Sequence, residues 1–363
     1  MGHIINAKDE LYYALAERLS RSPEGAPVNE HLLALLRKLY TETEAMIGSG
    51  FPLLPLTLEK ISEMTGIEPL KLKQIMDGMA HKGLVIDIPR KNSFYYMLTP
   101  VVVGFFEYTF MRTGSQLDLK ELAELFEKYF KSEDVMKVIA GMDTKIMRTL
   151  VYENVIPVAV ETEVIGYERA SELIRQSGGG AITMCACRHE AEHLGRACDA
   201  PVDVCTSLGG AAEWIVRKGL GRAATVDELL EVLDRTTKLG LVHLCDNVMN
   251  KPTYICHCCG CCCKVLGNIN RQNVYAAHPS NFIPQTDADS CTGCGLCEEK
   301  CPINAIAMND GVPEINGERC IGCGVCADAC PADSLKMHQR ETLHIPPENI
   351  KEKMSRMAAE KNR

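Results

Sequence analysis

The 363-residue chain carries 19 cysteines, and all of them lie between Cys185 and Cys330. Dense disulfide frameworks are typical of small secreted domains. The first residues lack the basic segment and apolar stretch of a signal peptide, so we expect a cytoplasmic protein whose thiols stay reduced. Clustered reduced thiols favour metal or iron–sulfur binding over disulfide bonds. The second half of the chain is therefore expected to fold around metal ligands.

Two copies of one spacing, C-x2-C-x2-C-x3-C-P, stand near the C-terminus. The first copy runs from Cys291 to Pro302, and the second runs from Cys320 to Pro331. Cysteines at this spacing reach several irons of one cubane from a tight loop, and the intervening glycines let the backbone curl around it. The paired pattern resembles the bacterial ferredoxins that hold two [4Fe–4S] clusters.

This resemblance implies crossed ligation, in which the fourth cysteine of each copy binds the other cluster. A pair of structural zinc sites is the alternative. The acidic residues around the repeats predict a low reduction potential, near about −400 mV, and a surface suited to a basic redox partner. One predicted ligand set is Cys291, Cys294, Cys297 and Cys330, and the other is Cys320, Cys323, Cys326 and Cys301.

Eleven further cysteines precede the repeats, and they fall into two groups. Six of them occupy eight consecutive positions, which would be an oxidation hazard if nothing ligated them. Adjacent cysteines point in different directions, so this run cannot give every thiolate to one iron cube. The first group is Cys185, Cys187, Cys198 and Cys205; the second is Cys245, Cys256, Cys258, Cys259, Cys261, Cys262 and Cys263.

Three interpretations of these middle cysteines stay open. The segment binds one further iron–sulfur cluster, for which the first group is the most regular four-ligand set, or it binds two, with the second on residues 256–263. The third interpretation is zinc or redox-active thiol pairs. His189 and His257 are candidate ligands that would raise a cluster potential, and Arg188 is a candidate donor to cluster sulfurs.

Two further resemblances concern this segment. The run Cys258-Cys259-Gly260 partly resembles the CCG motif of heterodisulfide reductase catalytic subunits, although one compressed copy stands where that family has two. The CACR and CHCCGCCC runs ahead of a ferredoxin-like segment resemble a poorly characterised group of multi-cluster iron–sulfur proteins of anaerobes. The first resemblance makes disulfide reduction a lead, the second implies no specific reaction, and no catalytic residue is assigned.

Residues 57–98 have the pattern helix, turn, helix and two strands, which resembles the winged-helix fold. The second helix carries Lys71, Lys73 and Lys82 but also acidic residues. DNA binding depends on phosphate neutralisation, so the weak basic character favours a docking or dimerisation module over DNA binding. The formal net charge of −9 likewise disfavours nucleic acid and anionic membranes as partners.

The chain is therefore expected to be an α+β multidomain protein. Strands are expected at residues 155–160 and 181–184, and no apolar run is long enough for a membrane-spanning helix. The predicted domains are a helical, winged-helix-like region (1–150), an α/β cysteine-rich iron–sulfur domain (151–276), a ferredoxin-like dicluster domain (284–340) and a C-terminal helix or tail (341–363).

The favoured function is electron transfer. Two ferredoxin-type [4Fe–4S] clusters would relay low-potential electrons to or from a middle cluster and a partner protein or soluble carrier. The N-terminal region would dock a partner or form a homodimer. The alternatives are a redox-sensing transcriptional regulator that uses the winged-helix-like segment, and a small reductase, an oxidoreductase that acts at the middle cluster.

Overall fold

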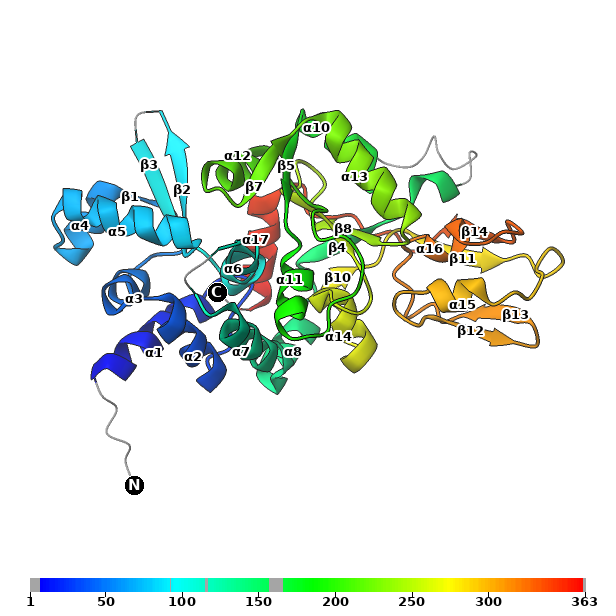
Figure 1. The fold of residues 1–363 in the computed structure, drawn as a ribbon, viewed down its shortest axis with the longest axis horizontal. Coiled ribbons are helices and arrows are strands. Elements are labelled where there is room, and N and C mark those ends of the chain that lie inside the picture. The colour runs from blue at the N-terminus through cyan, green and yellow to red at the C-terminus, as the bar shows by residue number, and fades with distance from the viewer. Residues whose placement is uncertain (1–6, 92, 115–116, 157–165, 362–363) are drawn as a thin grey trace, which may run out of the picture.

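The computed structural model describes residues 7–91, 93–114, 117–156 and 166–361. Helices and strands mix along the chain, in agreement with the expected α+β class. Figure 1 shows three parts in a row, which are the N-terminal helices, a large central sheet and a small C-terminal unit. Among the described residues, no helix is both long enough and apolar enough to cross a membrane.

Leucines at helical spacing build the first helices. In α2, Leu32, Leu35 and Leu36 are all buried. Thr41 begins α3 with a capping box, because its hydroxyl accepts from the Glu44 amide and the Glu44 carboxylate accepts from the Thr41 amide. These helices are α1 (Ala7–Ser20), α2 (Glu30–Leu39) and α3 (Glu42–Ser49).

The next segment holds two helices and a three-stranded antiparallel sheet in the order β1-β3-β2. Gly66 and Gly83 end the two helices with φ angles of 68° and 79°, which glycine adopts without the steric cost of a Cβ. The elements are β1 (Leu56–Thr57), α4 (Leu58–Thr65), α5 (Pro69–Lys82), β2 (Val85–Arg90) and β3 (Ser93–Leu98).

Aromatic rings join the following helices into one core. The ring of Phe106 lies 5.1 Å from that of Phe126 and 5.0 Å from that of Phe130, measured between centroids. The irregular segment Val101–Phe105 leads into these helices. They are α6 (Phe106–Phe110), α7 (Leu119–Lys131) and α8 (Glu133–Ala140).

A seven-stranded sheet forms the middle of the molecule, with the order β10-β4-β8-β9-β6-β5-β7. Strand β10 pairs with β4 in parallel, and the other pairs are antiparallel. The expected strand at 181–184 corresponds to β5, whereas the one at 155–160 lies mainly outside the described residues. The strands are β4 (Met147–Leu150), β5 (Gly180–Thr183), β6 (Cys205–Leu208), β7 (Gly221–Ala224), β8 (Val242–Asp246), β9 (Tyr254–Cys258) and β10 (Ala277–His278).

The two faces of this sheet pack differently. Leu150 and Ile255 lie on the face that α10 and α13 cover, whereas Leu244 and Tyr254 pack on the opposite face with α14. Neighbouring residues of a strand point to opposite faces, so the cysteines of β9 lie on the α14 side. The helices of this part are α10 (Ala170–Ser177), α11 (Ala186–His193), α12 (Gly209–Arg217), α13 (Val226–Lys238) and α14 (Lys264–Gln272).

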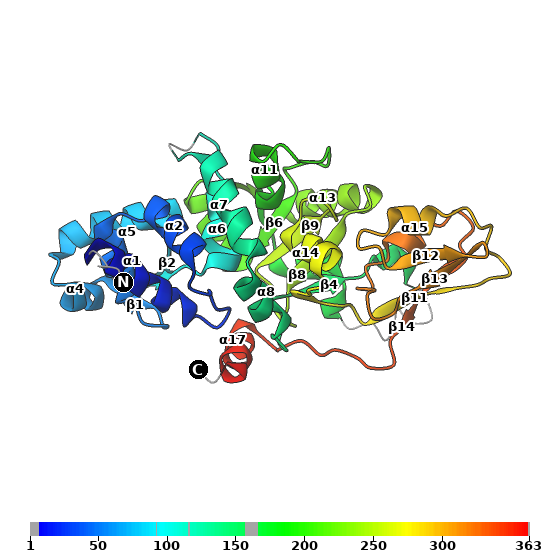
Figure 2. The same cartoon turned by 90° about the horizontal axis from the view of Figure 1, so that it is seen from below.

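The C-terminal unit consists of two antiparallel strand pairs and two short helices. After it, the chain runs back beneath the central sheet to α17 (Figure 2). There the Lys353 ammonium lies 2.9 Å from the Asp246 carboxylate, and both side chains are buried. The elements are β11 (Phe282–Thr286), α15 (Leu296–Lys300), β12 (Ile306–Asn309), β13 (Val312–Ile315), α16 (Val325–Asp328), β14 (Leu335–Gln339) and α17 (Ile350–Glu360).

One buried carboxylate fastens the N-terminal hairpin to the central part. Asp87 on β2 accepts from the Trp214 indole at 2.8 Å, from Arg217 at 2.6 Å and from Lys218 at 2.8 Å. Burial opposes ionisation of Asp87, but the hydrogen bonds from Arg217 and Lys218 outweigh it and lower the pKa of the carboxyl. The hairpin is therefore held against α12 by a charged network.

Replacing Asp87 by Asn should lower the free energy of unfolding by about 3 kcal/mol, because two cations near it lose their counter-charge. Since the folded-state pKa of Asp87 is lowered, its contribution is complete above the unfolded value of about 3.9 and is lost only as the pH falls through the folded value. The difference between D87N and wild type, measured by urea unfolding without oxygen, should therefore be equal at pH 5 and pH 8.

The matched control is Asp77→Asn, which removes the exposed pair with Lys73 on α5. Exposed pairs of this kind contribute about 0.5 kcal/mol or less. Equal losses in D87N and D77N would show that the Asp87 network does not hold the hairpin.

Candidate functional site

The cysteines of the two C-terminal repeats line two separate small cavities. One cavity is lined by Cys291, Cys294, Cys297 and Cys330, which we name the distal set. The other is lined by Cys301, Cys320, Cys323 and Cys326, which we name the proximal set. The fourth cysteine of each repeat thus lies with the first three of the other, an arrangement that fits two [4Fe–4S] clusters with crossed ligation.

Glycines shape both loops in the same way. Gly293 and Gly322 have φ angles of 67° each, and Gly295 and Gly324 have φ angles of 76° and 86°. A Cβ on Gly322 would lie 2.1 Å from the carbonyl oxygen of Phe282. The turns around the two cavities therefore require residues without a side chain at these positions.

The two sets differ in exposure. Cys294 of the distal set is exposed, whereas Cys320, Cys323 and Cys326 of the proximal set are buried. Burial raises the pKa of Cys323 to about 12, so a metal is needed to hold it as a thiolate. The distal set faces outward among exposed carboxylates, and the proximal set faces the central part. The exposed acidic residues of this unit are Asp287, Asp289, Glu298, Glu299, Asp310, Glu314 and Glu318.

Four of the middle cysteines converge on one point. The sulfurs of Cys198, Cys259, Cys261 and Cys262, the four-sulfur group, all lie within 4.8 Å of one another. The Cys198 sulfur lies 3.6 Å from that of Cys259 and 3.8 Å from that of Cys262, and the Cys261 and Cys262 sulfurs are 3.7 Å apart. Thiolates bound to one tetrahedral zinc at about 2.3 Å are roughly 3.8 Å apart.

These separations fit a single metal ion better than a cubane. In a [4Fe–4S] cluster each thiolate binds a different iron, so the four sulfurs are spread around the cube. A closed tetrahedral set of four thiolates is typical of structural zinc.

Six other cysteines form a continuous row, which we name the thiol row. Each sulfur interacts with the next one along the row. All six line a cavity on the α14 side of the central sheet. Hydrogen bonds with the two neighbouring thiols lower the pKa of Cys205, whereas the interaction with Cys205 raises the pKa of Cys256. In order, the row is Cys185, Cys205, Cys256, Cys258, Cys263 and Cys187.

A buried cation stands beside the thiol row. Arg188 donates to the carbonyl oxygens of Pro201 at 3.0 Å and His257 at 2.9 Å, while its Nε has no hydrogen-bond partner among the described residues. Burial opposes its charge, but the sulfurs of Cys185 and Cys259 raise its pKa. No described carboxylate pairs with it. A buried guanidinium without a carboxylate needs nearby negative charge, which metal-bound thiolates supply.

The structure groups the middle cysteines differently from the sequence-based prediction. Cys198 lies in the four-sulfur group and not with Cys185, Cys187 and Cys205, so the first sequence group does not form one set. The regrouping follows from the loop after α11, which brings Cys198 to the Cys259–Cys262 turn. Cys245 stays apart on the other face, where burial raises its pKa to about 12.

Neither candidate histidine is directed at the thiols. The Nδ1 of His257 lies 2.8 Å from the Thr236 hydroxyl and 2.9 Å from Nδ1 of His243, on the sheet face opposite Cys256. His189 uses its ring nitrogens toward the Phe110 carbonyl and the His193 ring. The alternation of the YICHC strand was the sequence signal that separates His257 from the neighbouring cysteines.

Comparison with known proteins covers one part of this architecture. A family model described as a 4Fe-4S dicluster domain matches residues 283–331. No curated protein and no solved structure matches the chain. The C-terminal unit is therefore an iron–sulfur unit of the 4Fe-4S dicluster type, and it is preceded in the sequence by a second group of cysteines that could hold metal.

Proposed function

We propose that this protein transfers low-potential electrons between its ferredoxin-type clusters and an iron–sulfur cluster held by the thiol row. The match to a 4Fe-4S dicluster domain supports the first pair of clusters. The unbroken row of six thiols beside the uncompensated Arg188 supports the further cluster. When bound, such clusters accept and release one electron at a time.

One contact carries this proposal. Gly260 lies against Pro302 so closely that a Cβ on Gly260 would be 2.2 Å from the Pro302 carbonyl oxygen. Asn270 donates to the carbonyl oxygens of both residues, at 3.2 Å and 2.9 Å. Pro302 directly follows Cys301 of the proximal set, and Gly260 lies between Cys259 and Cys261 of the four-sulfur group. The two cysteine-rich segments therefore touch at residues that are next to cysteines in each segment.

Packing around this contact is continuous. Cys258 and Cys263 of the thiol row share one apolar cluster with Cys320, Cys323 and Ile303 of the proximal side. This apolar packing joins the two sets of cysteines through protein side chains. The distal set, exposed among carboxylates, would receive electrons from a partner with a basic surface.

The four-sulfur group has a separate part in this proposal. It holds one tetrahedral zinc ion and thereby fixes the loop that contains Gly260 against Pro302. Zinc has no redox chemistry, so this ion orders the contact without carrying electrons.

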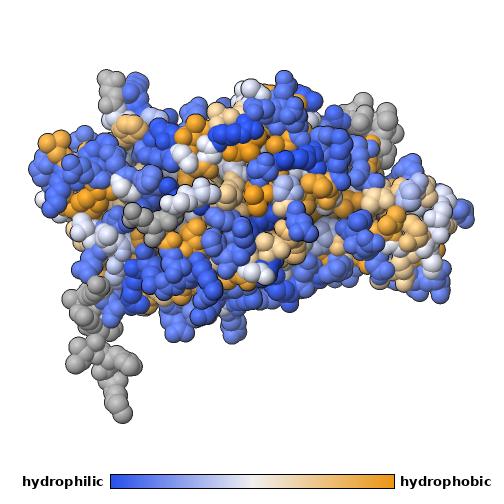
Figure 3. All heavy atoms as spheres, in the orientation of Figure 1, coloured by the Kyte–Doolittle hydropathy of each residue, from blue (hydrophilic) through white to orange (hydrophobic). Residues whose placement is uncertain are grey.

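The winged-helix-like segment acts as a protein-docking element in this proposal. Lys73 pairs with Asp77 and Lys82 pairs with Glu44, so two of the three lysines of the second helix are neutralised. Leu70 is 76% exposed, and Figure 3 shows apolar side chains at the end of the molecule where α4 and α5 lie. Such a surface suits a protein partner or a second copy of the chain better than DNA.

Metal analysis of protein purified without oxygen tests the cluster assignment. Two [4Fe–4S] clusters supply about eight irons per chain, and we expect an iron content above this value, together with about one zinc per chain. Only eight irons would restrict iron to the C-terminal unit and contradict the middle cluster. Cys198→Ser should lose the zinc and keep the iron, whereas Cys245→Ser, outside both groups, should keep both.

Replacing Gly260 by Ala should slow electron transfer between the proximal set and the thiol row by about tenfold or more, because the Cβ separates the two segments. The rate is measured by freeze-quench EPR after rapid reduction. The control is Gly210→Ala in α12, where a Cβ would meet nothing within 4 Å. An unchanged rate in G260A would show that electrons do not cross at this contact.

Replacing Arg188 by Met should weaken metal retention by the thiol row on the order of tenfold, because the positive charge beside the thiolates is lost. Iron and sulfide per chain are measured after dialysis against a chelator, and the C-terminal clusters should be unaffected. Arg175→Met, which changes an exposed arginine of the same part, serves as control. Full retention of iron in R188M would remove Arg188 from this role.

A further inference from the structure

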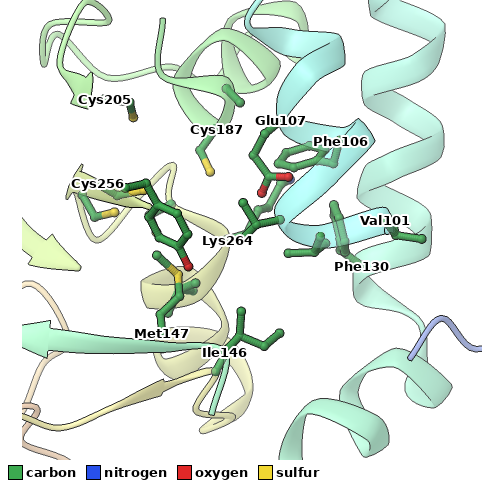
Figure 4. Close-up of a pocket in the computed structure, with 18 of the residues that line it drawn as sticks. Val101, Phe106, Glu107, Phe130, Ile146, Met147, Cys187, Cys205, Cys256 and Lys264 are labelled. Carbon is green, nitrogen blue, oxygen red and sulfur yellow. The ribbon is translucent and has the colours of Figure 1, made fainter. Parts of the chain in front are cut away.

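A cavity of about 190 Å³ lies between the thiol row and the aromatic helices. Figure 4 shows Cys187, Cys205 and Cys256 on one side of it and Val101 and Phe130 on the other. The space is thus bounded by two parts of the chain that are distant in sequence.

Most of the wall has no connection with metal binding. The side away from the thiols is built from apolar residues of the irregular segment, α7, α8 and the start of β4. A cluster held by the thiol row would contact the sulfur side only. The apolar lining residues include Val103, Phe130, Val135, Ile139, Met142 and Ile146.

Two carboxyl groups interrupt the apolar wall, those of Glu24 and Glu107. Glu107 begins α6, and its Oε2 accepts from the Gly104 amide at 2.7 Å. Figure 4 shows the rest of the carboxyl directed into the cavity. Burial is the main reason that its pKa rises to about 7, and the Cys205 sulfur adds to the effect. No described cation pairs with Glu107, and in its protonated form the buried carboxyl can donate a hydrogen bond into the cavity.

Two cations also line the cavity, Lys264 and Arg188. The Lys264 ammonium lies 2.7 Å from Glu127 and 2.6 Å from Glu190, and it stands over the rings of Phe106 and Phe130. A cationic ligand would find that aromatic position occupied. Arg188 stands on the sulfur side, where the thiolates of a metal-loaded row would compensate its charge. An anionic ligand would therefore meet Glu24, Glu107 and the thiolates without a free cation. The lining therefore selects an uncharged occupant.

We propose that this cavity binds a small, uncharged, mainly apolar organic molecule that carries one hydrogen-bond acceptor. The acceptor receives a hydrogen bond from Glu107, the apolar body packs on the helix side, and the opposite edge faces the thiol row. This proposal rests on the proposed function only for what the opposite edge of the ligand faces, a thiol row that holds metal; the cavity and Glu107 do not depend on that metal. The proposal supplies the ligand class that the small-reductase alternative would require.

Two matched probes test the site on metal-loaded protein without oxygen. 2-Acetylnaphthalene carries a carbonyl acceptor, and 2-ethylnaphthalene has a similar shape without it. Isothermal titration calorimetry should show one site per chain for both probes. Glu107→Leu should weaken binding of the ketone about tenfold and leave the hydrocarbon nearly unchanged, whereas Glu107→Gln, which still donates, should retain the ketone. Equal effects of E107L and E107Q on the ketone, or of E107L on both probes, would overturn the role of Glu107.

Blocking the cavity gives an independent test. Val103→Phe should weaken both probes at least about tenfold, because the ring occupies the apolar space. Val216→Phe makes the same change on α12 outside the cavity and should not. Both variants are first compared with wild type by circular dichroism. Probe binding that does not saturate, or that the V103F substitution leaves unchanged, would refute the site.

The metal content separates the two proposals. Probe binding in a protein whose middle cysteines hold no iron would support the ligand site and refute the proposed electron transfer to a middle cluster. A full iron content without probe binding would refute the ligand site and leave the proposed electron transfer unaffected.

Discussion

Burial of thiols beside a single buried cation is the constraint on which the rest of this structure depends. Strands β6 and β9 place Cys205, Cys256 and Cys258 on one sheet face, and Arg188 stands next to them without a carboxylate. A metal held by these thiols, as proposed, would supply the negative charge that the guanidinium lacks and would protect the thiols from oxidation. The helices cover this face, and the C-terminal unit touches its edge.

The charge near the cysteines changes from negative at the exposed surface to positive in the buried interior. The distal cysteines lie among exposed carboxylates, three of the four proximal cysteines are buried, and Arg188 is buried beside the thiol row. A negative surface disfavours the reduced state of a nearby cluster, whereas a buried positive charge favours added electrons. In the proposed relay, this arrangement would lower the energy of an electron that moves from the surface toward the thiol row.

The sequence was informative where ligands are close in the chain. The repeats that begin at Cys291 and Cys320 predict both C-terminal cavities, because local spacing determines the loop. It failed where loops decide which thiols meet, as for Cys198, and in the suggested use of His257, which strand alternation places on the other face. The cavity and Glu107 had no sequence signal, since their wall is assembled from apolar residues of four separate segments.

The return of the chain after the C-terminal unit gives that unit two attachments to the central part. Strand β10 joins the sheet just before it, and afterwards the carbonyl oxygens of Pro347 and Glu348 accept from the amides of Met249 and Asn250. The buried Lys353–Asp246 pair secures the second attachment. A unit held at both ends cannot swing as a tethered carrier does. Fixed geometry would therefore set the rate of the proposed electron transfer to the central part, instead of the effective concentration that a flexible linker imposes.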